Sequence, residues 1–179
     1  MLCRDLASLG VTEVDLASEL TLLLDTLNNP LPYHLVPAKR ARLENYFATV
    51  GQAVAGRKAR ISLADLASDL EAKADWLTAH LRSTEWIEGP EGCGWFNGYY
   101  DDNGRRVEGN RPEGVRMTLT GQTFPVMAGV ATDSQTVRIA RAVERYLYDP
   151  TVGGPRLHTD FGDTRRLSTT LGRCFGFAF

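Results

Sequence analysis

The stretch of the chain best suited to chemistry is an aromatic and polar run, Gly98-Tyr99-Tyr100-Asp101-Asp102-Asn103-Gly104. Aromatic rings can stack on the apolar faces of a sugar, while carboxylates and amides exchange hydrogen bonds with its hydroxyls. A hairpin that presents both beside a pocket would therefore suit a glycan. The same residues also fit a hairpin whose aromatics pack on the core and whose Asn103-Gly104 pair makes the turn. From the residues alone, this second interpretation is favoured.

Cleavage of a glycosidic bond needs a carboxylic acid and, unless phosphate is the nucleophile, a second carboxylate. The candidates in the second half of the chain are Asp101, Asp102, Glu108, Glu113, Asp160 and Asp163. Their spacing selects no pair, and each also suits a turn or a surface. The sequence therefore leaves the catalytic residues unknown.

Histidine and cysteine show no spacing typical of a metal or redox site. The three histidines and three cysteines are far apart along the chain: His34, His80, His158, Cys3, Cys93 and Cys174. The odd number and wide spacing of the cysteines favour free thiols. The glycine-rich fingerprints of nucleotide binding and the Gly-x-Ser-x-Gly nucleophile motif are also missing. We therefore expect no metal and no organic cofactor, and His158, in a loop, is the histidine best placed for a site.

These residues belong to a chain with the composition of an ordinary globular protein. Of its 179 residues, 43% are hydrophobic and 23% are charged, which suits one domain with its own core. The net charge of -2 provides no field that would attract nucleic acid or an anionic membrane. The apolar runs are too short to cross a bilayer, and charges interrupt the N-terminal residues that a signal peptide would need. We expect a cytoplasmic protein without nucleic-acid or membrane partners.

The first half of the chain, residues 1–88, is predicted to be helical. Leucines recur at helical spacing over 16–27, which predicts a first helix. A second helix is expected to begin near Pro37, because proline suits the first helical turn. A third has a capping signal at Ser62 and is expected to run to about Trp86.

The second half is predicted to mix a hairpin with helices. The Asn-Gly pair at its centre predicts a β-hairpin over 95–108. Helices are expected over 117–148, first a short buried one and then a longer one capped by Thr132 or Asp133. The tail over 151–179 is rich in loop-forming residues.

Three stretches of the second half match a known family in the expected order. They are WFNGYYDDNGR at 95–105, RMTLTGQTFPVMAG at 116–129, and LYDP followed by the glycine pair over 147–154. From Trp95 onward the sequence thus resembles glycoside hydrolase family 94. That family includes cellobiose and chitobiose phosphorylases and the C-terminal region of cyclic β-1,2-glucan synthases. The first half carries no motif that matches the family.

The resemblance implies a mainly α fold, a segment of an (α/α)6 barrel with one β-hairpin. It also implies an inverting exchange of a β-glucosidic linkage for phosphate, in which one Asp protonates the glycosidic oxygen and phosphate attacks the anomeric carbon. Inorganic phosphate would be a co-substrate, and a disaccharide or oligosaccharide the substrate. Arg116, Gln122, Tyr100 and Asp101 are then the candidates for binding the sugar.

Two departures from the family's pattern bear on activity. The family's acid lies in an Asp-Trp-Asn-type motif, but here Asp75-Trp76 precedes Leu77 on an expected amphipathic helix, where Asp75 suits the surface and Trp76 suits packing. The family also continues past its Phe-Gly-Phe segment, found here at 175–177, into a Lys-Glu-Asn-type stretch and a phosphate-binding histidine. We therefore expect 1–179 to be a single partial catalytic-domain segment, completed by the remainder of the barrel or by another copy of the chain.

A different class of protein also fits the sequence. A helical scaffold or interaction module without chemistry, from a truncated or degenerate gene, would show the same helices and the same aromatic hairpin. The sugar and the linkage stay undetermined under either interpretation.

Overall fold

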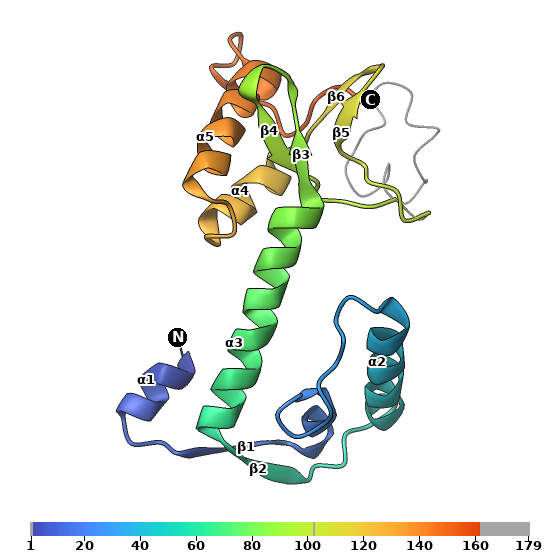
Figure 1. The fold of residues 1–179 in the computed structure, drawn as a ribbon, viewed down its shortest axis with the longest axis vertical. Helices are drawn as coiled ribbons and strands as arrows, with labels where there is room; N and C mark the ends of the chain where they lie inside the picture. The colour runs from blue at the N-terminus through green and yellow to red at the C-terminus, as the bar shows by residue number, and fades with distance from the viewer. Residues whose placement is uncertain (1, 102, 162–179) are drawn as a thin grey trace. The chain divides into compact units, whose positions relative to one another are not determined.

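The computed structural model describes residues 2–101 and 103–161 (Figure 1). The chain divides into two compact units, Met1–Trp76 and Leu77–Phe179. Within the described residues, every helix is too short or too polar to cross a bilayer.

The unit Met1–Trp76 combines helices with one antiparallel strand pair. Its elements in chain order are α1 (Leu2–Ser8), β1 (Glu13–Ala17), the 3-10 helix η1 (Ser18–Leu23), α2 (Val36–Val50), β2 (Lys58–Ser62) and most of α3 (Leu63–His80). Strand β1 pairs with β2, with Val14 opposite Ile61, and α2 packs on η1. The largest buried side chains of this unit, Leu24, Ile61 and Leu63, come from three different segments.

The first predicted helix, over 16–27, is only partly correct, because residues 18–23 form a short 3-10 helix and residues 16–17 belong to a strand. Its leucines do recur at helical spacing, but the chain forms β1 and then η1 there. The backbone of β1 bonds instead to β2, and Thr12 accepts a hydrogen bond from the amide of Leu63 at 2.9 Å. A partner more than 40 residues away along the chain therefore overrides the local preference, which is a weak determinant of structure.

The second and third predicted helices are confirmed. Helix α2 has proline in its first turn, as expected from Pro37. At the start of α3 the amide of Asp65 donates to the Ser62 hydroxyl at 3.3 Å. A π-helical turn, η2 (Leu81–Glu85), follows α3 directly, so the helical segment ends within a residue of the expected Trp86.

The described residues of the unit Leu77–Phe179 form three further strand pairs and the helices α4 and α5 around a small core. Its elements after η2 are β3 (Trp86–Glu88), η3 (Pro90–Gly92), β4 (Gly94–Phe96), β5 (Gly109–Arg111), β6 (Gly114–Arg116), α4 (Thr120–Met127), α5 (Asp133–Ala142), η4 (Val143–Leu147), β7 (Tyr148–Asp149) and β8 (Gly154–Pro155). Both α4 and α5 contact β4. Trp95, Met117, Ala142 and Leu147 are fully buried in the core between these elements.

The expected fold class, a mainly α segment of an (α/α)6 barrel, is wrong. The described residues form a mixed α/β structure with four two-stranded antiparallel sheets, and their helices close no barrel. Much of the difference lies in short segments bounded by glycine, such as β3 with β4 and β5 with β6. Such segments are too short for a helical stripe, and they satisfy their backbone polar groups by pairing with a neighbour.

The single hairpin expected over 95–108 differs in its pairing. Trp95 and Phe96 of β4 pair with β3, which precedes them, and not with the return strand. The expected turn does form: the amide of Gly104 donates to the carbonyl of Asp101 at 2.9 Å, and φ at Gly104 is 71°. On the two sides of the turn, Tyr100 and Arg106 form an isolated antiparallel bridge.

The predicted cap of the last long helix is confirmed at Thr132. Its hydroxyl accepts from the amide of Gln135 at 3.2 Å, and the Gln135 side chain accepts from the amide of Thr132 at 3.0 Å. Such a reciprocal capping box satisfies two amides that have no partner inside the helix.

Thr132→Ala is expected to lower the free energy of unfolding by about 1 kcal/mol, because it removes this cap. Urea denaturation of the full chain measures the change. Ser134→Ala is a matched control, since Ser134 is exposed in the first turn of α5, and it should cost nothing. Equal stability of the two variants would contradict the capping role.

Candidate functional site

Gln122, one of the four predicted sugar-binding residues, lies on α4 and is only 1% exposed. Its side-chain amide donates to the carbonyls of Phe96 at 3.0 Å and Thr118 at 3.1 Å. Its side-chain oxygen accepts from the amide of Phe96 at 2.7 Å. Gln122 therefore joins α4 to β4 through backbone groups, and its sugar contact stays a prediction.

The same amide also donates to Glu108, at 3.1 Å from the carboxylate oxygen Oε2. Glu108 is 1% exposed, and its other oxygen accepts from the Thr118 hydroxyl. Burial raises the pKa of Glu108 to about 7, although hydrogen bonds from Thr118, Gln122 and the amide of Gly98 oppose the rise. The interior therefore contains a carboxyl group whose pKa lies near neutral pH.

Two glycines allow the chain to approach this carboxyl group closely. A Cβ at Gly121 would lie 2.8 Å from Oε1 of Glu108 and 2.9 Å from the Thr118 hydroxyl oxygen. A Cβ at Gly98 would lie 3.0 Å from the Cα of Gly121. Since real Cβ atoms avoid such distances, only glycine fits at these two positions without a shift.

A second carboxylate, Glu85, closes η2 and is 7% exposed. The Asn97 amide donates to its Oε2 at 3.0 Å, and the Tyr100 hydroxyl donates to its Oε1 at 2.8 Å. Arg106 adds an ion pair at 3.8 Å. Burial first, and then the hydrogen bond to Glu85, raise the pKa of Tyr100, so its hydroxyl stays a donor.

Glu85, Asn97 and the glycine pair line a cleft of about 350 Å³ in the unit Leu77–Phe179. The cleft lies where the end of β4 and the start of α4 come together. Figure 1 shows these two elements side by side. The other lining residues of the cleft include Phe96, Tyr99, Thr120 and Phe124. The Phe124 side chain is 66% exposed, and the Tyr99 and Thr120 hydroxyls are 3.0 Å apart. The cleft thus offers aromatic surface beside hydroxyl, amide and carboxylate groups, the mixture that suits a polyhydroxylated ligand.

The other predicted site residues lie apart from the cleft. Asp101 is in the turn, where its carboxylate accepts from the amides of Arg105 at 2.8 Å and Asn103 at 2.9 Å. These bonds, that from Arg105 first, lower its pKa, so Asp101 is a poor proton donor. Arg116 lines a separate hollow of about 210 Å³ with Phe161, whose ring centroid is 5.9 Å from the guanidinium carbon.

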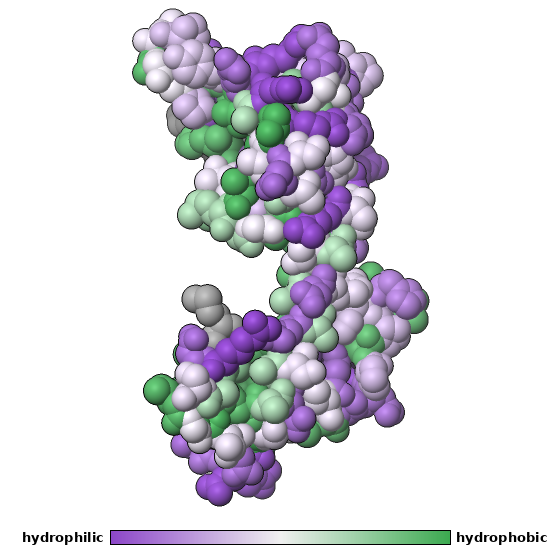
Figure 2. Space-filling model, turned by 60° about the vertical axis from the view of Figure 1, so that its left-hand side comes forward, coloured by the Kyte–Doolittle hydropathy of each residue, from purple (hydrophilic) through white to green (hydrophobic). Residues whose placement is uncertain are grey.

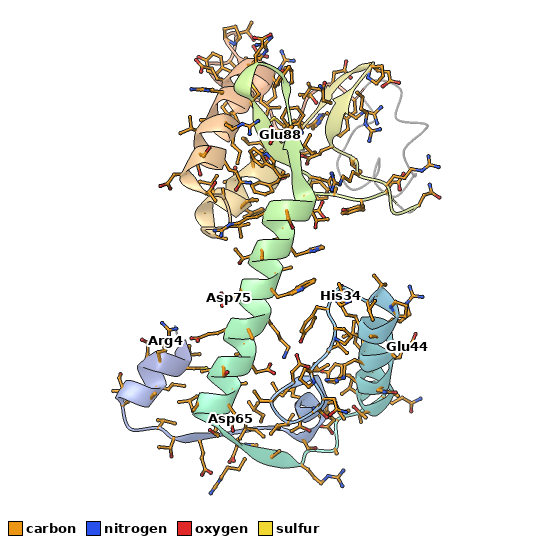
Figure 3. All side chains as sticks on the ribbon, viewed as in Figure 1. Arg4, His34, Glu44, Asp65, Asp75 and Glu88 are labelled. Atoms are coloured by element: carbon orange, nitrogen blue, oxygen red, sulfur yellow. The ribbon has the colours of Figure 1, made fainter. Side chains whose placement is uncertain are left out.

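The remaining candidate residues are dispersed. Asp75 is exposed on α3, as predicted (Figure 3), and Trp76 packs with its ring centroid 5.3 Å from that of Tyr33. His158 lies with Nδ1 2.8 Å from the carbonyl oxygen of Thr159, which accepts the hydrogen bond. Glu113 and Asp160 line the hollow that contains Arg116. The candidates Asp102 and Asp163 and the last loop-rich residues, 162–179, lie outside the described residues.

Sequence reasoning missed Glu85 and Phe124. Glu85 falls at the end of the third predicted helix, where an acidic residue carries no signal of its own. Phe124 falls in the short helix that the sequence predicts to be buried. Only its exposure on α4, beside the cleft, distinguishes it from a packing residue.

In comparisons with known proteins, no family model matches this chain and no curated protein matches it. The resemblance to glycoside hydrolase family 94 therefore rests on the three sequence stretches alone. Within residues 2–101 and 103–161, no three His, Cys, Asp or Glu side chains lie together in a way that could hold a metal ion.

The raised pKa of Glu108 predicts that stability falls as pH rises. The folded protein binds this proton more tightly than the unfolded chain, whose carboxyl has a pKa near 4.5. The contribution is therefore complete below that value and is lost as pH rises through about 7, a difference of about 3 kcal/mol. Urea denaturation at about pH 5 and about pH 8 measures it.

Glu108→Gln is the matched variant, because glutamine keeps the shape and cannot ionise. It should lose this part of the pH dependence. An unchanged difference between the two pH values would show that Glu108 does not titrate in this range.

Proposed function

We propose that the chain is a segment of a carbohydrate-active enzyme, and that the cleft beside α4 is where it binds saccharide. One observation carries the proposal: the exposed ring of Phe124 shares a cleft with the Glu85–Asn97 pair, whose hydrogen bond is 3.0 Å long. An aromatic ring can stack on the apolar face of a sugar, and a carboxylate–amide pair can form hydrogen bonds with its hydroxyls.

Sugar recognition would depend on the hydrogen-bonding positions and the exposed surface that these groups do not use within the protein. A carboxylate has about four acceptor positions, and Glu85 uses part of them for Asn97 and Tyr100. Its remaining lone pairs can accept from sugar hydroxyls. The Thr120 hydroxyl can donate and accept, and the Phe124 ring can cover an apolar sugar face. A volume of about 350 Å³ suits one or two sugar rings.

The reaction class comes from the sequence resemblance, which supports exchange of a β-glucosidic linkage with inorganic phosphate. In this proposal Glu85 is the carboxylate that touches the sugar. Glu108 holds the cleft in shape and is not assigned as the acid, because it lies behind Gly98 and Gly121 with both oxygens bonded to protein. A general acid must reach the glycosidic oxygen.

A second function, that of an interaction module, is favoured by the exposed apolar residues of the other unit. Val36, Leu43 and Phe47 recur at helical spacing on α2, and their exposed fractions are 59%, 45% and 59%. Figure 2 shows apolar residues, in green, at the surface of both units. Exposed apolar stripes of this kind mark surfaces that bind other molecules.

A titration with β-linked glucose disaccharides, followed by calorimetry, separates the two functions. Phe124→Ala should weaken binding by roughly 1 kcal/mol, because it removes the stacking face. Phe47→Ala is the matched control, an equally exposed phenylalanine in the other unit, and it should bind as the unchanged chain does. No disaccharide binding, or the same loss in both variants, would contradict the saccharide cleft and favour the interaction module.

A further inference from the structure

The unit Met1–Trp76 contains a larger cavity, of about 580 Å³, that is separate from the proposed saccharide cleft. Eight leucines line it, supplied by β1, η1, the loop that follows, α2 and α3. Among them, Leu43 and Leu70 are about half exposed, so the cavity opens to solvent. The size falls within the range of small-molecule sites, and the wall is mostly apolar.

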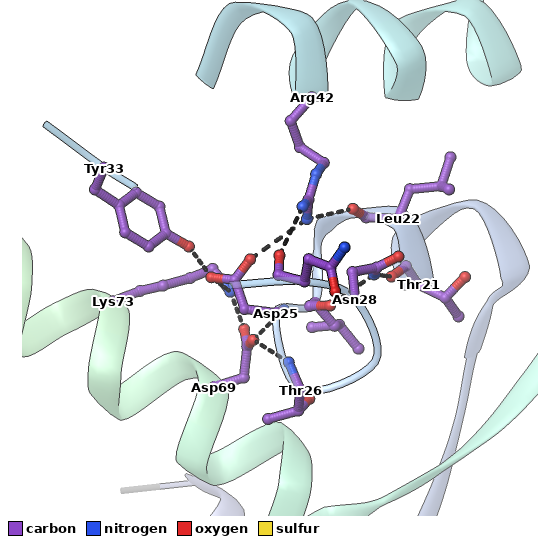
Figure 4. A network of polar contacts seen from close by, with 11 residues as sticks. Thr21, Leu22, Asp25, Thr26, Asn28, Tyr33, Arg42, Asp69 and Lys73 are labelled. Atoms are coloured by element: carbon purple, nitrogen blue, oxygen red, sulfur yellow. Dashed lines mark hydrogen bonds and ion pairs between the residues drawn. The ribbon is translucent and has the colours of Figure 1, made fainter. Parts of the chain in front are cut away.

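One wall of this cavity carries a network of charged side chains (Figure 4). The side chain of Asp69 is fully buried and accepts from the amides of Asp25 at 2.5 Å and Thr26 at 3.2 Å. Lys73 pairs with Asp69 and lies 3.4 Å from the carboxylate of Asp25. Arg42 pairs with Asp25 at 3.3 Å. Two cations thus balance two carboxylates, and the network needs no ion from a ligand.

Tyr33 completes the network by donating its hydroxyl to Asp25. Burial first, and then the hydrogen bond to Asp25, raise the pKa of Tyr33, so this hydroxyl stays neutral. The polar wall therefore carries no net charge.

Lys39 also lines the cavity, and unlike Arg42 and Lys73 it is not part of this charge-balanced network. It lies on α2, with its ammonium nitrogen 5.4 Å from the centroid of the Trp76 ring. Within the described residues, no carboxylate forms an ion pair with Lys39. Lys39 also borders an adjoining hollow of about 450 Å³, where Arg40 and Glu44 offset each other in charge. The cavity thus combines an apolar interior with one uncompensated positive charge.

We propose that this cavity binds an amphipathic monoanion, a free alkyl carboxylate, with its chain among the leucines and its head group at Lys39. The positive charge of Lys39 favours an anionic head group. A cationic head group would be repelled by Lys39, and a neutral one would leave it without a counter-ion. The leucines favour an alkyl chain as the rest of the ligand, since each further CH₂ group that leaves water should tighten binding about fourfold.

Calorimetric titrations of the full chain with decanoate, decanol and decyltrimethylammonium, each as monomers, test the proposal. Decanoate should bind most tightly, and octanoate more weakly by the factor expected for two CH₂ groups. Lys39→Gln should weaken decanoate binding about tenfold and leave decanol binding unchanged, because it removes only the charge.

Two further variants make the result specific. Lys58→Gln removes an exposed lysine of β2 in the same unit and should change nothing. Leu70→Trp should fill the cavity and weaken decanoate and decanol alike, and circular dichroism verifies that each variant folds. The proposal is overturned if decanol binds as tightly as decanoate, if the cation binds best, if Lys39→Gln has no effect, or if none of the three ligands binds.

Discussion

Asp69→Ala should destabilise the unit Met1–Trp76 by about 3–5 kcal/mol, the usual cost of removing one partner from a buried ion pair. The Asp69 side chain is fully buried and joins α3 to the loop after η1 through the amides of Asp25 and Thr26. Alanine would leave both amides without that acceptor and would leave Lys73 with Asp25 alone. Urea denaturation followed by circular dichroism measures the loss.

Asp75→Ala is the control, because Asp75 lies on the same helix and is exposed. It should change the free energy of unfolding by less than about 0.5 kcal/mol. Similar losses in the two variants would show that charge on α3, and not the buried network, determines the stability of this unit.

Gln122→Ala should destabilise the unit Leu77–Phe179 by about 4 kcal/mol. It deprives the amide and carbonyl of Phe96 of their side-chain partner and leaves Glu108 with one donor fewer, and each unpaired buried group costs about 1–3 kcal/mol. The melting temperature and the affinity for a β-linked disaccharide should be measured on the same variant. If Gln122 is structural, the melting temperature should fall strongly, whatever the measured affinity for the disaccharide.

Thr123→Ala, the adjacent exposed position of α4, is the control and should cost less than about 0.5 kcal/mol. An unchanged melting temperature in Gln122→Ala with a weaker sugar affinity would reverse the assignment. Gln122 would then be a direct sugar contact, as the sequence resemblance suggests.

The elements that the sequence predicts well are those with strong local signals. Pro37 at the first turn of α2, the Ser62 hydroxyl before α3 and the Thr132 cap of α5 all act within three or four residues. Their effect depends little on the rest of the fold, so a pattern in the sequence is enough to locate them.

The elements that the sequence predicts poorly depend on distant partners. At the start of the helix expected over 16–27, Leu16 and Ala17 instead end β1, because β2 lies beside them. In the same way, Trp95 pairs with Ile87 before it instead of with the return strand after it. Local spacing contains no information about which of two possible partners a short strand takes.

The candidate site shows the same division. Gln122 and Glu108 were recognisable as polar groups that could matter, but their meeting behind Gly98 and Gly121 depends on how α4 packs on β4. Glu85 and Phe124 have residue types that are common on surfaces and in cores. Their place in one cleft follows only from the folded arrangement.

The saccharide cleft is tested most directly by following the backbone amide resonances of the full chain as a β-linked glucose disaccharide is added. We expect the amide resonances of Asn97, Gly98 and Gly121 to shift in a saturable manner, since all three residues line the cleft. Phe124→Ala should reduce the shifts at equal disaccharide concentration. Saturable shifts confined to the unit Met1–Trp76, or no shift at Gly98 and Gly121, would contradict the account.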